Sequence, residues 1–159
     1  MKIFLAINLC RHEPKRFVPL VKEVYKKNQD NKLLNNSKNM KNLIDRLNKK
    51  PQDIFPQITL DVDASKACRA TNEIAIDKNE DVPAKGGSIA QFAELQADQR
   101  NNECEEYTMV KFESQDAMEF VALELAMDWE REGDAGKKSP ILDQAVTKVG
   151  ISNKPHKKT

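Results

Sequence analysis

Two aspartates that lie one residue apart, Asp61 and Asp63, have the type and spacing best suited to chemistry. They belong to "ITLDVDAS" (58–65), in which apolar and polar residues alternate as in a strand with one buried face. Two carboxylates at the end of a strand can hold Mg²⁺, and one of them can attack a phosphoryl group. The ordinary alternative is that both acids form the polar, outward face of the strand.

The segment around these acids resembles the first motif of the haloacid-dehalogenase-like phosphatases. The resemblance implies that Asp61 is the nucleophile, that Asp63 is the general acid and base, and that Mg²⁺ binds beside them. It covers residues 58–65, with Ala64 and Ser65 where that family usually has Gly and Thr. A small Mg²⁺-dependent phosphatase is therefore one alternative function. The leading interpretation assigns no catalytic residue, no metal and no cofactor.

The three cysteines, Cys10, Cys68 and Cys104, include no CxxC pair and predict neither a zinc ribbon nor a disulfide framework. Free thiols are typical of a reducing compartment. The apolar run 3–9 is short for a signal peptide, and no small-x-small cleavage site follows it. No run reaches the roughly 18 apolar residues of a transmembrane helix. We therefore expect a cytoplasmic location, or export without a cleaved signal peptide, and no membrane partner.

The net charge of +1 conceals a strong segregation of charge along the chain. Residues 1–50 carry 13 Lys and Arg against 4 Asp and Glu, residues 51–134 carry 7 against 20, and residues 135–159 carry 6 against 1. The basic and acidic segments either pack together, so that their fields cancel, or leave a basic surface for nucleic acid or an acidic protein. As the second alternative function, nucleic-acid binding would use Lys22, Lys26, Lys27, Lys38, Lys41, Lys49 and Lys50.

The spacing of apolar residues predicts an α+β fold, in which a small mixed sheet of three to four strands is flanked by helices. An α/β layer is the alternative. The expected strands are 2–9, 58–63, 73–77 and 107–112. The expected helices lie within 13–28, over 64–72 and 88–100, and from an N-cap at Ser37 to before Pro51. Pro19 either lies in the first turn of a helix that begins near Val18 or kinks a longer helix.

The chain is expected to form one domain with a C-terminal extension. Residues 1–135 form the single α+β domain, with a basic part (1–50) and an acidic part (51–134). Residues 136–159 follow as a loop, a short helix within 141–149 and a basic, disordered tail.

The most regular element is a helix expected over residues 114–132, capped by Ser114 and ended by Gly133, which packs on the sheet. One apolar stripe predicts burial in the core and consists of Met118, Val121, Ala122, Leu125 and Trp129. A second apolar arc consists of Phe120, Leu123 and Met127. Two arcs imply that the helix is covered on two sides, either by the chain's own N-terminal helices or by a partner.

The second arc makes protein binding the leading functional interpretation. The chain would be a non-catalytic protein–protein interaction module, such as an adaptor, an inhibitor or a regulatory protein. Its partner would be another protein or a second copy of the chain, bound through Phe120, Leu123 and Met127. The Lys- and Asn-rich composition is typical of bacterial proteins, so a secreted effector is one form of this function.

Overall fold

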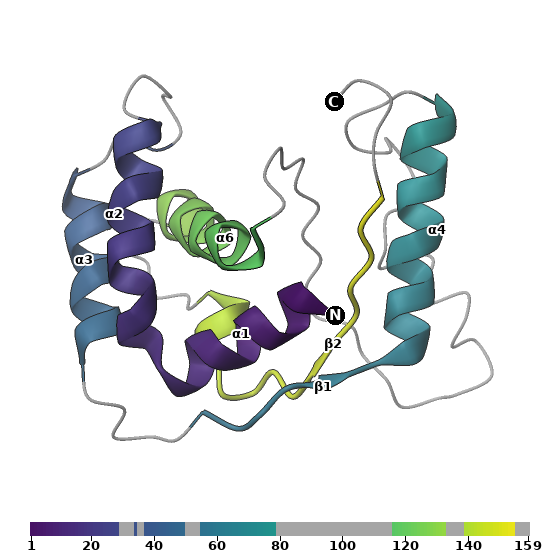
Figure 1. Ribbon diagram of the computed structural model, residues 1–159, viewed down its shortest axis with the longest axis horizontal. Helices are drawn as coiled ribbons and strands as arrows, with labels where there is room; N and C mark the ends of the chain where they lie inside the picture. The colour runs from purple at the N-terminus through teal and green to yellow at the C-terminus, as the bar shows by residue number, and fades with distance from the viewer. Residues whose placement is uncertain (29–33, 35–36, 50–54, 79–115, 133–138, 155–159) are drawn as a thin grey trace. The chain divides into compact units, whose positions relative to one another are not determined.

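The computed structural model describes residues 1–28, 34, 37–49, 55–78, 116–132 and 139–154. The chain divides into two units, Met1–Gln57 with Ser114–Thr147 and Ile58–Glu113 with Lys148–Thr159. Each unit therefore combines two stretches that are far apart in the sequence (Figure 1). That residues 1–135 form one domain stays a prediction.

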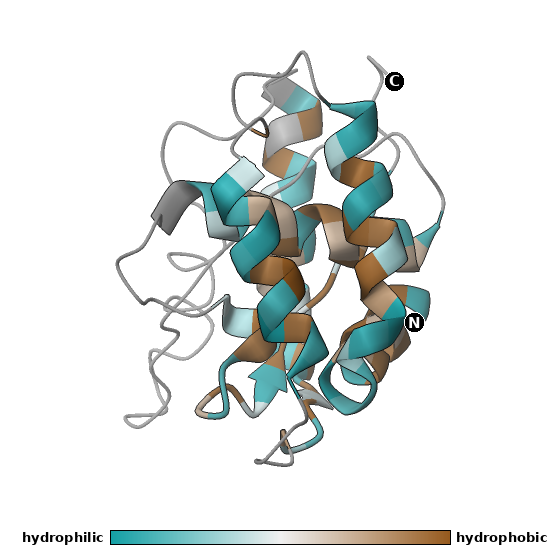
Figure 2. Ribbon diagram, turned by 90° about the vertical axis from the view of Figure 1, so that its left-hand side faces the viewer, coloured by the Kyte–Doolittle hydropathy of each residue, from teal (hydrophilic) through white to brown (hydrophobic). Residues whose placement is uncertain are grey.

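The described part of the first unit is helical. Its elements are α1 (Lys2–His12), η1 (Pro14–Phe17), α2 (Val18–Lys27), α3 (Ser37–Asn48), α6 (Ala117–Glu132) and η2 (Pro140–Leu142). Helix α6 packs against α1, α2 and α3, so a helix from the second half of the chain completes the core of the first three. Hydrophobic and hydrophilic residues alternate in bands along these helices (Figure 2), as expected where one side of each is buried.

The apolar run at the N-terminus forms α1, and the strand predicted over 2–9 is wrong. Ala6, Ile7 and Cys10 are buried, which is the spacing of one helix face. A run of about eight apolar residues is compatible with a buried strand or a buried helix, so its periodicity alone does not decide between them. Packing of α1 against α6 decides in favour of the helix.

The next two helices agree with the prediction. Helix α2 begins at Val18 with Pro19 in its first turn, where the missing N–H costs no hydrogen bond. Helix α3 is found where it was expected, with Ser37 as its first residue and not as the N-cap before it. Their buried apolar residues lie three or four apart and are Val21, Val24 and Tyr25 in α2 and Leu43 and Leu47 in α3.

The helix predicted over 114–132 is confirmed over Ala117–Glu132, with a different cap. Asp116 Oδ1 accepts hydrogen bonds from the backbone N–H groups of Met118 (2.8 Å) and Glu119 (3.3 Å), so Asp116 is the N-cap. Ser114 lies outside the described residues. The partners of α6 are helices, so the prediction that it packs on a sheet is wrong.

The second unit contains one helix and a parallel pair of two-residue strands: β1 (Thr59–Leu60), α4 (Val62–Lys78) and β2 (Lys148–Val149). Thr59 lies opposite Lys148, and Leu60 lies opposite Val149. Helix α4 includes the predicted helix 64–72, which is confirmed.

The predicted α+β fold with a sheet of three to four strands is wrong for the described residues, and so is the α/β layer, because these residues are mostly helical with one two-stranded sheet. The strand expected over 58–63 is limited to Thr59–Leu60, because α4 starts directly after Asp61. The strand expected over 73–77 belongs to α4, in which Ala67 and Thr71 are buried one turn apart.

The short helix expected within 141–149 is also wrong. A single 3₁₀ turn ends at Leu142, and Lys148–Val149 is a strand. The helix expected over 88–100 and the strand expected over 107–112 lie outside the described residues, as does the chain from residue 155. In the part of the chain that the structure describes, no helix has the length and apolar character needed to cross a membrane.

Candidate functional site

Asp61 and Asp63 lie at the start of α4, and each forms hydrogen bonds with residues of the first turn. Asp61 Oδ1 accepts a hydrogen bond from the backbone N–H of Ala64 (2.8 Å), which makes Asp61 the N-cap of α4. The other oxygen of Asp61 lies 3.9 Å from Lys148 Nζ, and Asp63 Oδ1 accepts a hydrogen bond from Lys66 Nζ (2.9 Å). Acids in a first turn are also favoured by the helix dipole. Asp61 therefore caps α4, and Asp63 is an acid of its first turn.

A metal site at these acids is not supported by further ligands. Among the described residues, no group of three or more His, Cys, Asp or Glu side chains is arranged to hold a metal ion. The phosphatase function at Asp61 and Asp63 stays a prediction.

The second apolar arc of α6 lies at intermediate exposure. Phe120, Leu123 and Met127 are all half-buried, whereas Val121 and Leu125 on the other side are fully buried. Three helices of the same chain pack against α6, so its own N-terminal helices provide cover for it. The role of the arc in binding a partner stays a prediction.

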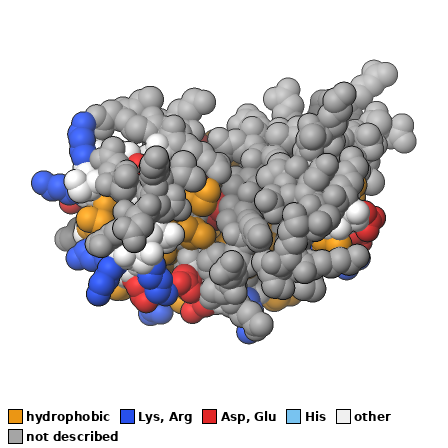
Figure 3. Space-filling model, turned by 90° about the horizontal axis from the view of Figure 1, so that it is seen from above, with side chains coloured by type: hydrophobic (Ala, Val, Ile, Leu, Met, Phe, Trp, Pro, Cys, Tyr) orange, Lys and Arg blue, Asp and Glu red, His pale blue; other side chains and the backbone are white. Residues whose placement is uncertain are grey.

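The predicted nucleic-acid-binding lysines gather on two neighbouring helices. Helices α2 and α3 pack against each other and lie side by side in Figure 1. Of the seven lysines, Lys50 is outside the described residues. The other six are all exposed: Lys22, Lys26 and Lys27 on α2, Lys38 and Lys41 on α3, and Lys49 directly after α3. We call these six residues the lysine surface. Blue Lys and Arg side chains lie along the left-hand edge of the space-filling view (Figure 3).

Lys27, one residue of the lysine surface, already contacts two carboxylates of its own chain. Lys27 Nζ donates to Glu119 of α6 at 2.9 Å and lies 3.2 Å from Glu23. The hydrogen bond to Glu119, followed by the one to Glu23, raises the pKa of Lys27. The basic N-terminal segment therefore contacts the acidic segment at this point, as one interpretation of the charge pattern predicts.

A partly buried polar network joins α2 and α3 to α6. Glu130 accepts hydrogen bonds from the Tyr25 hydroxyl (2.9 Å) and from Asn39 Nδ2 (3.0 Å). Tyr25 and Asn39 are buried. Burial raises the pKa of Tyr25, and the hydrogen bond to the Glu130 carboxylate raises it further. One residue from each of three helices thus meets in a network that fixes the position of the lysine surface.

Arg11 is a buried cation to which the sequence analysis assigned no role. Its side chain donates to four backbone carbonyls, those of Pro56 (2.9 Å), Ile141 (3.0 Å), Asp143 (2.7 Å) and Val146 (3.1 Å). Burial lowers the pKa of Arg11, and the Asp143 carboxylate opposes that effect. The guanidinium also lies 5.5 Å from the centre of the Phe55 ring, within cation–π range. No sequence signal predicts this role, because its acceptors are backbone groups far along the chain.

The described cysteines are both free thiols. Cys10 is fully buried, and burial raises the pKa of its thiol to about 12, so it is a poor nucleophile. Cys68 Sγ donates to the backbone carbonyl of Gly150 at 3.5 Å. Cys104 lies outside the described residues.

The chain matches no protein-family model, and comparisons with curated proteins and with solved structures likewise find no match.

Proposed function

We propose that the protein is a non-catalytic interaction module that binds an acidic protein surface through its lysine surface. The observation that supports the proposal is that all six residues of the lysine surface, on α2, on α3 and directly after α3, are exposed. Both helices direct their apolar stripes into the core of the first unit, which leaves their polar sides for a partner.

Electrostatic attraction would bring the two proteins together and set their orientation. A positively charged patch raises the rate of association with a negatively charged one and disfavours binding of proteins with a positive surface. The contact of Lys27 with Glu119 is an example of the same pairing within the chain. Lys22, Lys26 and Lys41 form no ion pair with the described residues, so their charges are available to a partner.

An acidic protein fits this surface better than single-stranded nucleic acid does. Stacking of bases needs exposed aromatic rings beside the basic groups. The aromatic residues of η1 and α2, Phe17 and Tyr25, are buried, and α3 contains none.

The test uses poly-L-glutamate as the acidic probe and compares two charge-matched double variants. Lys22→Glu with Lys41→Glu changes the lysine surface, whereas Lys2→Glu with Lys15→Glu changes exposed lysines elsewhere in the first unit. We expect the first pair to weaken binding about tenfold or more at roughly 50 mM salt, and the second pair to have a smaller effect. Fluorescence anisotropy of the labelled probe gives the dissociation constants.

A short DNA duplex serves as the competing probe in the same assay. Tighter binding of the duplex, lost in the Lys22/Lys41 variant, would replace the proposal with the nucleic-acid alternative. No binding of either probe at low salt, or equal effects of the two double variants, would contradict the proposal.

We also propose a cytoplasmic location. The described cysteines, Cys10 and Cys68, are free thiols, and free thiols are typical of a reducing compartment.

A further inference from the structure

A pocket in the second unit lies between α4 and the extended segment 149–154. It has a volume of about 320 Å³ and is lined by Val62, Ser65, Lys66, Arg69, Ile151, Ser152, Asn153 and Lys154. This volume is at the lower end of the range for small-ligand sites, roughly 300–1,000 Å³. The pocket therefore suits a small molecule or one side chain of a larger ligand.

Hydrogen bonds between side chains of α4 and the backbone of the segment hold the two walls together. The Ser65 hydroxyl donates to the Asp61 carbonyl (2.7 Å) and accepts from the Ile151 N–H (3.2 Å). One helical turn further on, the Cys68 thiol donates to Gly150. Asn72 Nδ2 then donates to the carbonyl and to the hydroxyl oxygen of Ser152, both at 3.2 Å. The pocket walls are thus preorganised by the chain itself.

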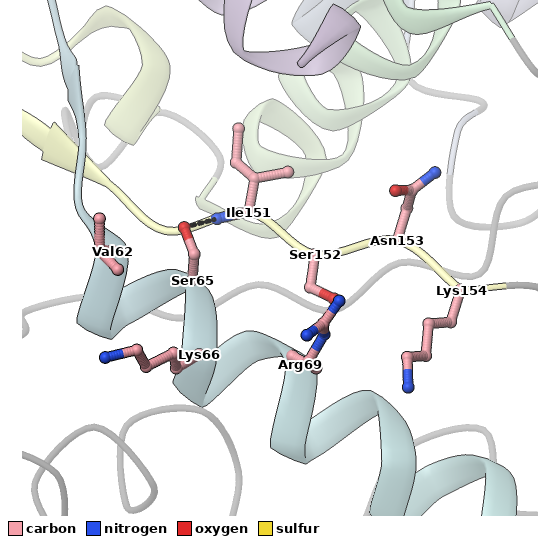
Figure 4. A pocket seen from close by; sticks show the side chains of 8 residues that line it. All are labelled: Val62, Ser65, Lys66, Arg69, Ile151, Ser152, Asn153 and Lys154. Carbon is pink, nitrogen blue, oxygen red and sulfur yellow. Dashed lines mark hydrogen bonds between the residues drawn. The ribbon is translucent and has the colours of Figure 1, made fainter.

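The lining residues carry three cations and no acid. Lys66 forms an ion pair with Asp63, and Lys154 forms one with Glu73. Neither acid lines the pocket. Arg69 forms no ion pair within 4 Å and no hydrogen bond with the residues that the structure describes, although its charge helps to lower the pKa of Glu73, one helical turn further along α4. Its guanidinium rises from α4 toward Ser152 on the opposite wall (Figure 4). Its planar guanidinium can bind two oxygens of one anion.

The anion that fits this arrangement has more than two oxygens. The Ser152 hydroxyl oxygen accepts from Asn72, and its hydrogen has no acceptor among the described residues. A carboxylate bound by Arg69 uses both of its oxygens, whereas a phosphoryl group leaves a third oxygen for the Ser152 hydroxyl and for Lys66 or Lys154. The donor set therefore favours a phosphoryl group.

Apolar side chains complete the lining. Val62 is 65% exposed, although it is a large aliphatic residue, and Ile151 comes from the opposite wall. A solvent-exposed aliphatic side chain beside a cationic cluster suits a ligand in which an anion is attached to an apolar group.

We propose that this pocket binds the phosphoryl group of a phosphate monoester with a small apolar or aromatic body, with Arg69 as the bidentate partner of the phosphoryl oxygens. Ser152 and the two lysines hold the remaining oxygen, and Val62 and Ile151 contact the body. The proposal is independent of the lysine surface, since it uses residues of the other unit.

Phenyl phosphate is the main probe, with inorganic phosphate and benzoate as comparisons. We expect saturable shifts of the amide NMR signals of residues 62–69 and 150–154, with phenyl phosphate binding more tightly than the other two. Replacing phenyl phosphate by N-acetyl-phosphotyrosine amide then distinguishes a phosphorylated side chain of a protein from a free small molecule. Tighter binding of the phosphotyrosine derivative would indicate a phosphorylated protein as the ligand, and tighter binding of phenyl phosphate would indicate a free small molecule.

Arg69→Gln should weaken phenyl phosphate binding about tenfold or more, because hydrogen bonds to a charged group are lost. Lys148→Gln removes the same charge from an exposed lysine that does not line the pocket and should change the affinity less than about twofold. Val62→Asn should reduce the preference for phenyl phosphate over inorganic phosphate. No saturable binding, equal affinity for benzoate, or an unchanged affinity in Arg69→Gln would overturn the proposal.

Discussion

At the scale of single residues, Arg11 is the clearest example of a buried charge that is compensated by the backbone. An isolated buried cation costs several kcal/mol, and hydrogen bonds to its N–H groups are needed to offset this. Here the compensation comes from four carbonyls that belong to two separate stretches, one at residue 56 and one at residues 141–146. Arg11 therefore joins α1 to both stretches.

Replacing Arg11 by Met should lower the free energy of unfolding by about 3–5 kcal/mol, because four backbone carbonyls in partly buried positions lose their donor. Urea denaturation followed by circular dichroism measures the loss. Arg16→Ala is the matched control, since Arg16 forms an exposed ion pair with Glu13 and its removal should cost less than about 1 kcal/mol. Equal losses in the two variants would contradict the role given to Arg11.

Sequence patterns predict the exposed lysines well and the buried arginine poorly. Lys22 and Lys41 lie opposite apolar stripes that already fix the buried side of α2 and α3, so their exposure follows from helical periodicity. The acceptors of Arg11 lie 45 to 135 residues away and are carbonyl oxygens, which every residue has. No pattern of side chains can therefore reveal them.

At the scale of elements, the length of an apolar pattern decides how well the sequence predicts structure. Helices α2, α3 and α6 each have apolar residues at spacings of three and four over ten or more residues, and all three were correctly predicted as helices. The segments 2–9 and 73–77 are short and rich in Ile, so strand propensity suggested the wrong element. The pairing of β1 with β2 joins residues far apart in sequence and has no local signal.

The contact between α4 and the segment that follows β2 depends on one glycine. A Cβ at Gly150 would lie 2.4 Å from the backbone carbonyl carbon of Ala64 and 2.5 Å from its Cβ. These distances are far below van der Waals contact, so any larger side chain must push the segment away from the helix. The close approach also allows the hydrogen bonds of Ser65 and Cys68 to the segment.

Gly150→Ala should destabilise the second unit by about 1–3 kcal/mol through this overlap. Hydrogen exchange of the α4 amides should become faster, while that of α2 and α3 stays unchanged. Lys148→Ala in the same segment is the control and should have an effect within about 0.5 kcal/mol, because its side chain is exposed. Unchanged protection of α4 in Gly150→Ala would show that the segment is not packed as described.

At the scale of the whole molecule, each unit is built from two separate pieces of the chain. The first unit needs residues on both sides of 58–113, and the second unit needs both α4 and the C-terminal segment. The chain passes from one unit to the other near residues 57 and 147. No Gly- or Ser-rich linker is found at either point, so composition does not predict the division.

A chain that ends at Thr147 should keep the first unit and lose the structure of the second. The truncation removes β2 and the partners of Ser65, Cys68 and Asn72, while every acceptor of Arg11 remains. Hydrogen exchange should therefore show persistent protection in α1, α2 and α6 and rapid exchange in α4. A chain that ends at Lys154 is the control and should keep protection in both units. Protection of α4 in the shorter chain would contradict this dependence.

The late position of α6 in the chain has a consequence during translation. When the ribosome has made α1, α2 and α3, their apolar faces have no central helix to cover them, because α6 begins only at Ala117. At roughly 5–20 residues per second, several seconds pass before that helix emerges. The nascent protein therefore exposes hydrophobic surface throughout this interval. Its yield in the cell should depend on chaperones that cover this surface until α6 has emerged from the ribosome.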